Sequence, residues 1–252
     1  MIKKLVIRYN NIELKARHYF SNISTNKKSP AIIISHEFGT NMFSTARYAR
    51  YLYKLGYHVF IFDFSGSGSG FSKGRKSTDM SVLTEKEDLL AVINYVKSLE
   101  IVDNNKIILG GCSQGGLVTA LVASDLKESI EKIFLLYPAF SISDDAKRGS
   151  ILGKKIDLNS IPTSFRTIYV KLGKKYVNDA LSLDPWEQIK DYTGPVFISH
   201  GDKDSIVDVN YAIKAHKIYR NSVLQLINNG RHLYLFSAKK RALQGIKEFL
   251  ED

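Results

Sequence analysis

Lys106 to Leu117 reads KIILGGCSQGGL, and this stretch decides the fold. It begins with the apolar run of a buried strand, and an apolar helical pattern starts at its end. Between the two, residues 111–115 (GCSQG) fit the G-x-S-x-G pattern of a nucleophile elbow, a tight turn that lifts Ser113 clear of a sheet. Glycine is needed on both sides because larger side chains would collide in so tight a turn. The stretch predicts a strand, a turn and a helix, with Ser113 as the candidate nucleophile.

Composition places the chain among soluble globular proteins. Its 252 residues suit one large α/β domain, and its hydrophobic and charged fractions are ordinary. A single cysteine excludes an intrachain disulfide and fits a reducing compartment. The opening residues MIKKLVIRYN hold too short an apolar run for a signal peptide, and no segment is long enough to span a membrane. We therefore expect a cytoplasmic protein without a membrane partner.

The net charge of +11 raises the question of nucleic-acid binding. The lysines are scattered along the whole chain, with no basic run and no interleaved aromatic residues of a known module. We therefore expect no nucleic-acid partner. A positive field that helps to attract anionic substrates is the better interpretation of the charge.

Strand-like and helix-like patterns alternate along most of the chain. This alternation predicts a mostly parallel sheet of about eight strands with helices on both faces. Strands are expected at 5–9, 12–19, 31–35, 59–62, 107–109, 132–137, 196–199 and 223–227, and helices at 43–55, 84–99, from 117, from 185, 209–219 and 237–250. Thr84 and Glu87 form a candidate capping box for the second helix. The polar segment Asn22–Pro30 is expected to be a loop, and its Asn22-Ile23-Ser24 glycosylation pattern to be accidental.

The alternation breaks between Ser141 and Leu183. A long section without a regular pattern is typical of a lid over a functional site. We therefore interpret 141–183 as an inserted cap within a single domain, 1–252. It leaves the sheet at a strand end near the elbow, and it holds too many apolar and aromatic residues for a solvated loop. Phe165 and Tyr169 are its candidate substrate-binding residues.

Three further strands carry polar residues just past their carboxyl ends, where sites lie in an open α/β sheet. They give residues 36–39, 200–204 and 228–232. An elbow of this kind implies the chain order serine, acid, histidine. His232 alone lies in a glycine-containing loop after the final strand, and an imidazole can take and return a proton at neutral pH. His232 is therefore the candidate base, ahead of the other five histidines, His18, His36, His58, His200 and His216.

The acid that orients this histidine is Asp204 or Asp202, with Asp208 a more distant alternative. Any of the three would also suit an ordinary turn. Spacing favours Asp204, which lies farther into its loop and can bend back towards the site.

Several segments of the chain resemble those of a known family. The segments SHEFGTN, FDFSGSGSG, DMSVLTEKEDL, GGCSQGG, YPAFSISDDA, GPVFISHGDKDSIV and NNGRH are similar to those of α/β-hydrolase serine esterases, most of all the bacterial cinnamoyl/feruloyl esterase-like branch. The resemblance implies the α/β-hydrolase fold, Ser113 as nucleophile, Asp204 as acid and His232 as base. It also implies an oxyanion hole formed by the backbone N–H groups of Phe38 and Gln114.

Three positions depart from the family pattern. Glu37 stands in the oxyanion loop where the family usually has glycine, so its carboxylate is expected to point away or to be paired. Cys112 precedes the nucleophile in place of histidine or glutamate, and a thiol nucleophile is disfavoured because this position lies off the apex of the turn. Asp208 replaces a frequent proline. None of these changes removes a predicted catalytic group.

The sequence thus predicts a carboxylic-ester hydrolase that acts through an acyl-enzyme, on small aryl or hydroxycinnamoyl esters, with no cofactor and no metal. Peptidase, thioesterase or acyltransferase chemistry on the same triad is the alternative. A non-catalytic binding protein with a hydrolase fold is a second alternative, and a homodimer is left open.

Overall fold

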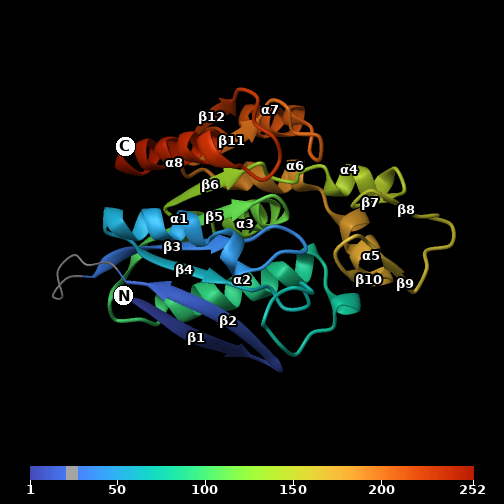
Figure 1. Cartoon of the computed structure of the whole chain (residues 1–252), viewed down its shortest axis with the longest axis horizontal. Coiled ribbons are helices and arrows are strands. Elements are labelled where there is room, and N and C mark those ends of the chain that lie inside the picture. Colours follow the sequence, from blue (N-terminus) through green and yellow to red (C-terminus); the bar gives the residue numbers. More distant parts are fainter. Residues whose placement is uncertain (21–27) are drawn as a thin grey trace.

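The computed structural model describes residues 1–20 and 28–252 (Figure 1). Its centre is an eight-stranded sheet in the order β1-β2-β4-β3-β5-β6-β11-β12. The last six strands in this order are parallel. β2 pairs antiparallel with β4, and β1 pairs antiparallel with β2 at the edge of the sheet. The predicted mostly parallel sheet is therefore confirmed. The strands are β1 (Ile2–Tyr9), β2 (Ile12–Tyr19), β3 (Ser29–Ser35), β4 (His58–Phe62), β5 (Val102–Cys112), β6 (Lys132–Leu136), β11 (Val196–Gly201) and β12 (Ser222–Ile227).

Helices cover both faces of this sheet, because alternate residues of each buried strand point to opposite sides. Ile33 and Leu109 join a core with α2 (Val82–Lys97), α3 (Gln114–Leu126) and α7 (Val209–Ile218). Their neighbours, such as Ile32 and Ile108, join a second core with α1 (Ala46–Leu52) and α8 (Phe236–Glu251). The strands are consequently continuous apolar runs without polar alternation.

Several predicted helix bounds differ from the structure, and the helix expected from Leu117 already begins at Gln114. The helix expected over 43–55 is divided into η1 (Met42–Ser44), α1 and η2 (Tyr53–Leu55). The capping box of α2 is formed by Ser81 and Thr84, whose side chains each bond the backbone N–H of the other. The predicted pair of Thr84 and Glu87 is wrong, since Glu87 lies one turn into the helix and pairs with Arg75 at 2.9 Å.

Part of the loop predicted for Asn22–Pro30 falls outside the described residues, together with the Asn22-Ile23-Ser24 pattern. Its last two residues, Ser29 and Pro30, already belong to β3. The short helix that was expected to start at Pro185 is present as α6 (Pro185–Gln188). The Asp184 side chain caps it by accepting from the backbone N–H of Glu187.

The segment 141–183 leaves the sheet after β6 and lies beyond the arrowheads of the parallel strands (Figure 1). Its buried side chains Phe165, Leu172 and Tyr176 belong to the same core as α2 and α3, so the segment has no hydrophobic core of its own. It contains α4 (Ile142–Lys147), β7 (Ser150–Ile151), β8 (Lys154–Lys155), β9 (Ser164–Arg166), β10 (Lys171–Gly173) and α5 (Lys174–Ser182). We keep the name cap for residues 141–183.

Candidate active site

Ser113 occupies the turn between β5 and α3, with φ 52° and ψ −120°. This is a strained conformation for a residue other than glycine, and the Ser113 N–H is fixed by a 2.9 Å hydrogen bond to the carbonyl of Leu136. A Cβ atom at Gly111 would lie 2.3 Å from the carbonyl oxygen of Gly115, and one at Gly115 would lie 2.3 Å from that of His36. The elbow therefore requires glycine at both flanking positions, for the steric reason predicted from the sequence.

The structure brings Ser113, His232 and Asp204 together. His232 Nε2 lies 2.9 Å from Ser113 Oγ, and His232 Nδ1 lies 2.6 Å from Asp204 Oδ2. His232 comes from the loop after β12, and Asp204 from the loop after β11. The ring of Tyr137 packs edge-on against the imidazole at 4.9 Å between centroids. Loops of three parallel strands thus assemble one connected chain of hydrogen bonds.

The other two candidate acids lie elsewhere. Asp202 is exposed, and its described hydrogen bond runs from its backbone N–H to the carbonyl of Ile227. Asp208 caps α7 by accepting from the backbone N–H of Asn210 at 2.7 Å. Among the three aspartates of this loop, Asp204 is the one in contact with His232.

Asp204 is held as a carboxylate from several directions. Its Oδ1 accepts from the backbone N–H groups of Ile206 and Val207 at 2.9 and 3.0 Å. Its Oδ2 lies 3.1 Å from Nε2 of His200 as well as close to His232. Burial by itself favours the neutral acid, but the hydrogen bonds from His200 and His232 outweigh it and hold the pKa of Asp204 well below its ordinary value. The acid therefore stays ionised at neutral pH.

His200 is a site residue that sequence reasoning missed. It is fully buried at the end of β11, where its Nε2 also lies 3.0 Å from the carbonyl of Val207. From the sequence, His200 is considered only as an alternative to His232 for the catalytic base. The usable signal was its position four residues before the acid, on the strand that carries the acid loop.

The loop that carries Phe38 lies against the start of α3, where Gln114 is located. Gln114 is the first residue of this helix, so its N–H has no acceptor within the helix and the helix dipole favours negative charge there. Gly115 lies against the carbonyl of His36, which brings the loop carrying Phe38 to the same place. His36 fixes that loop, since its Nε2 accepts from the N–H of Phe64 at 3.1 Å and its Nδ1 lies 2.7 Å from the carbonyl of Glu37.

Glu37 lies in the oxyanion loop and is buried. Its carboxylate is paired with hydroxyl groups, which is one of the two arrangements expected from the sequence. Its Oε1 accepts from the hydroxyl of Tyr137 at 2.8 Å. Its Oε2 accepts from Ser44 at 2.5 Å and from Thr40 at 3.2 Å. The carboxylate is thus bound by three hydroxyl groups.

Cys112 is fully buried in the core beneath α1 and α8. Burial and the nearby charge of Glu37 raise the pKa of its thiol well above the ordinary value. A protonated, enclosed thiol is a poor nucleophile, because the thiolate is the reactive form. This supports the expectation that Cys112 packs and does not react.

The two candidate substrate residues of the cap lie in different surroundings. Phe165 is buried in β9. Tyr169, in the turn between β9 and β10, is 65% exposed, and its ring lies 6.3 Å from that of Phe38. A Cβ at Gly39 would lie 2.6 Å from the Cβ of Tyr169. Tyr169 therefore packs on the oxyanion loop, while Phe165 supports the cap from within.

A second cap residue at the site, Tyr176, was not predicted. Its ring lies 6.1 Å from that of Phe38, and its hydroxyl donates to the side-chain carbonyl of Gln114 at 2.5 Å. The sequence offered only an aromatic residue on an amphipathic helix, which is the usual sign of a core position.

Comparison with known proteins agrees with this geometry. Residues 30–169, which are more than half of the chain, match the family model of the alpha/beta hydrolase fold. The chain belongs to this family, and the fold predicted from the resemblance is confirmed.

Individual relatives carry the comparison further. The structure of Est1E from Butyrivibrio proteoclasticus with ferulic acid bound superposes with a TM-score of 0.90 at 29% identity, covering 98% of each chain. A putative esterase/lipase of Mycoplasma genitalium is 27% identical and covers 90% of this chain and 91% of its own length. The quorum-quenching protein AidA of Acinetobacter baumannii is 28% identical over 48% of this chain, which matches 40% of AidA's length. The predicted resemblance to the feruloyl esterase-like branch is thus confirmed.

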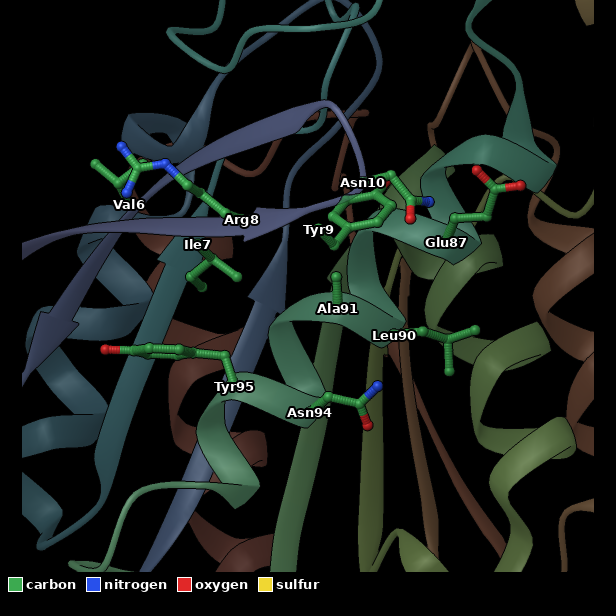
Figure 2. A pocket seen from close by; sticks show the side chains of 10 residues that line it. All are labelled: Val6, Ile7, Arg8, Tyr9, Asn10, Glu87, Leu90, Ala91, Asn94 and Tyr95. Atoms are coloured by element: carbon green, nitrogen blue, oxygen red, sulfur yellow. The ribbon is translucent and has the colours of Figure 1, made fainter.

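Away from the site, a cavity of about 650 Å³ lies between edge strand β1 and helix α2. Figure 2 shows Tyr9 and Arg8 from the strand and Leu90 and Tyr95 from the helix around it. None of the predicted site residues lines it. Within residues 1–20 and 28–252, no cluster of three or more His, Cys, Asp or Glu side chains is suited to a metal ion, and no helix is long and apolar enough to cross a membrane.

Proposed function

We propose that this protein is a carboxylic-ester hydrolase with Ser113 as nucleophile, His232 as base and Asp204 as acid. One observation carries the proposal. It is the continuous chain from Ser113 Oγ to His232 Nε2, and from His232 Nδ1 to Asp204 Oδ2, at 2.9 and 2.6 Å. This order of contacts is what proton transfer from serine requires.

The mechanism follows from the contacts. His232 accepts the proton of Ser113 as the hydroxyl attacks the ester carbonyl, and Asp204 stabilises the imidazolium that forms. The backbone N–H groups of Phe38 and Gln114 are proposed to bind the oxyanion. His232 then protonates the leaving alcohol, and a water activated by the same histidine cleaves the acyl-enzyme.

Small aryl or hydroxycinnamoyl esters are the proposed substrates. The similarity to Est1E, which was solved with ferulic acid, supports an aromatic acyl group. The ring of Tyr169, which is 65% exposed beside Phe38 on the oxyanion loop, offers an aromatic surface to such an acyl group.

A substrate panel tests the proposal. Acetyl, benzoyl and feruloyl esters are compared with a thioester and a peptide by kcat/KM, and a fluorophosphonate probe reports covalent reaction at Ser113 by mass spectrometry. Hydrolysis of the esters together with labelling of Ser113 is expected. Preference for the thioester or the peptide would move the activity to another acyl transfer on the same triad, and absence of both labelling and turnover would indicate a binding protein.

A further inference from the structure

A buried chain of hydrogen bonds links the cap to the start of α3. Tyr176 in α5 donates its hydroxyl to Gln114 Oε1 at 2.5 Å, and Gln114 Nε2 donates to Glu85 Oε2 in α2 at 2.8 Å. All three side chains are almost completely buried, with about 1% exposed. The amide of Gln114 is therefore held from two different helices.

This pairing satisfies the Gln114 amide on both sides. Its carbonyl oxygen accepts from Tyr176, and its NH₂ group donates to Glu85. Moving the amide away from these partners would leave buried polar groups unpaired, which costs about 1–3 kcal/mol for each group. Since Gln114 is also the first residue of α3, fixing its side chain restrains the backbone N–H that projects from the turn.

The same cap residue contacts the other half of the proposed oxyanion hole. The Tyr176 ring lies 6.1 Å from the ring of Phe38, at an interplanar angle of 66°. A second contact attaches α5 to α2, because Asp179 accepts from the hydroxyl of Ser81 at 2.5 Å. Helix α5 is consequently placed by α2 and is in direct contact with both residues whose N–H groups would receive the oxyanion.

We propose that Glu85 and Tyr176 are positioning residues that clamp Gln114 and so set the geometry of the oxyanion hole. The inference rests on the proposed ester hydrolysis and extends it to two residues that do not need to touch the reacting atoms. It makes the cap part of the catalytic geometry as well as a cover over the site.

The charge of Glu85 matters because of where it lies. Burial raises its pKa to about 8, and Asp88 on the same helix adds to the shift, while Gln114 and the guanidinium of Arg75 oppose it. From α5, Tyr176 faces it as a neutral phenol whose pKa is raised further by burial, by Glu85 itself and by Asp145 of α4. At neutral pH most Glu85 side chains are therefore uncharged.

The sign of the pH effect follows from this state. As the pH rises through about 8, Glu85 loses its proton and becomes a buried anion one side chain away from the oxyanion hole. A negative charge there opposes the oxyanion of the transition state. The expected result is a fall of kcat/KM above this pH.

The test measures kcat and KM on p-nitrophenyl acetate between pH 5 and 9.5 for the wild type, Glu85→Gln and Tyr176→Phe. Glu85→Gln keeps an acceptor for Gln114 and cannot ionise, so the fall above about pH 8 should disappear. Tyr176→Phe keeps the ring against Phe38 and removes the hydroxyl. It should lower kcat by roughly tenfold with little change in KM, a fraction of the roughly 10²–10³ lost when an oxyanion donor is removed outright.

Glu87→Gln is the matched control, because Glu87 lies on the same helix and its side chain is 59% exposed. It should keep the wild-type profile. An unchanged high-pH fall in Glu85→Gln, or an unchanged kcat in Tyr176→Phe, would overturn the positioning role. If Glu85→Gln does not fold, the kcat of Tyr176→Phe decides alone. A wild type that neither hydrolyses the ester nor reacts with a fluorophosphonate would instead overturn the proposed function, and this inference with it.

Discussion

Two regions of the molecule, the carboxyl ends of the strands that carry the triad and the cap, are held in place in different ways. Ser113 directly follows β5, Asp204 and His232 lie in the loops after β11 and β12, and these three strands belong to one continuous sheet. The cap leaves this sheet after β6 and packs into the core of α2 and α3 through Phe165, Leu172 and Tyr176, while its β9–β10 turn leaves Ile168 89% exposed. The position of the triad residues is thus set by the sheet, and the position of the cap is set by side-chain packing against α2 and α3.

The largest effect is expected when the nucleophile of the triad is removed. Ser113→Ala should lower kcat by about 10⁶, because loss of the triad serine removes the nucleophile. Ester turnover by the purified variant measures it. Cys112→Ala is the matched control, since the buried thiol is adjacent in sequence and should be dispensable. An inactive cysteine variant beside an active serine variant would show that the nucleophile is wrongly assigned.

The second effect separates the acid from its neighbours. Asp204→Asn should reduce kcat by up to roughly 10⁴, because the tautomer of His232 is no longer fixed. Asp202→Asn should have far less effect, since Asp202 is exposed and makes no described contact with His232. Turnover of the two folded variants is compared, and the opposite ranking would move the acid to Asp202.

The third effect concerns the inside of the cap. Phe165→Ala removes a side chain that is only 8% exposed, so the free energy of unfolding should fall by about 3–5 kcal/mol. Urea unfolding followed by fluorescence measures the change. The cap shares one core with α2 and α3, so the loss should appear in the main unfolding transition. A separate early transition would contradict this shared core.

The smallest effect is expected for Tyr169, on the exposed surface of the cap. It tests whether the cap influences which substrate is hydrolysed. Tyr169→Ala should change the ratio of kcat/KM for bulky aryl and acetyl esters by roughly tenfold, as expected for a lost pocket contact of about 1–3 kcal/mol. Ile168→Ala, one residue away and more exposed, is the control. If both variants keep the wild-type ratio, Tyr169 supports the oxyanion loop without selecting substrates.

Much of the fold could be predicted because its signals are local. Apolar runs such as residues 31–35 form strands buried on both faces, and the glycines around Ser113 specify the elbow. Helix starts were harder. The box that caps α2 uses Ser81 and Thr84, yet Thr84 and Glu87 match the same spacing. The structure decides between them, because Ser81 has the extended backbone of an N-cap residue and Thr84 already lies inside the helix.

The sequence by itself determined the parallel sheet, the elbow at Ser113 and the order of the polar loops that bring His232 back to it. These follow from hydrophobic periodicity, from glycine sterics and from the rule that strand ends share one edge of a sheet. Only the tertiary structure decided that His200 also binds Asp204, and that Tyr176 and Glu85 hold Gln114. Such contacts join residues far apart in the chain through single hydrogen bonds, and burial, which makes each bond matter, is a property of the packed molecule and of no single segment.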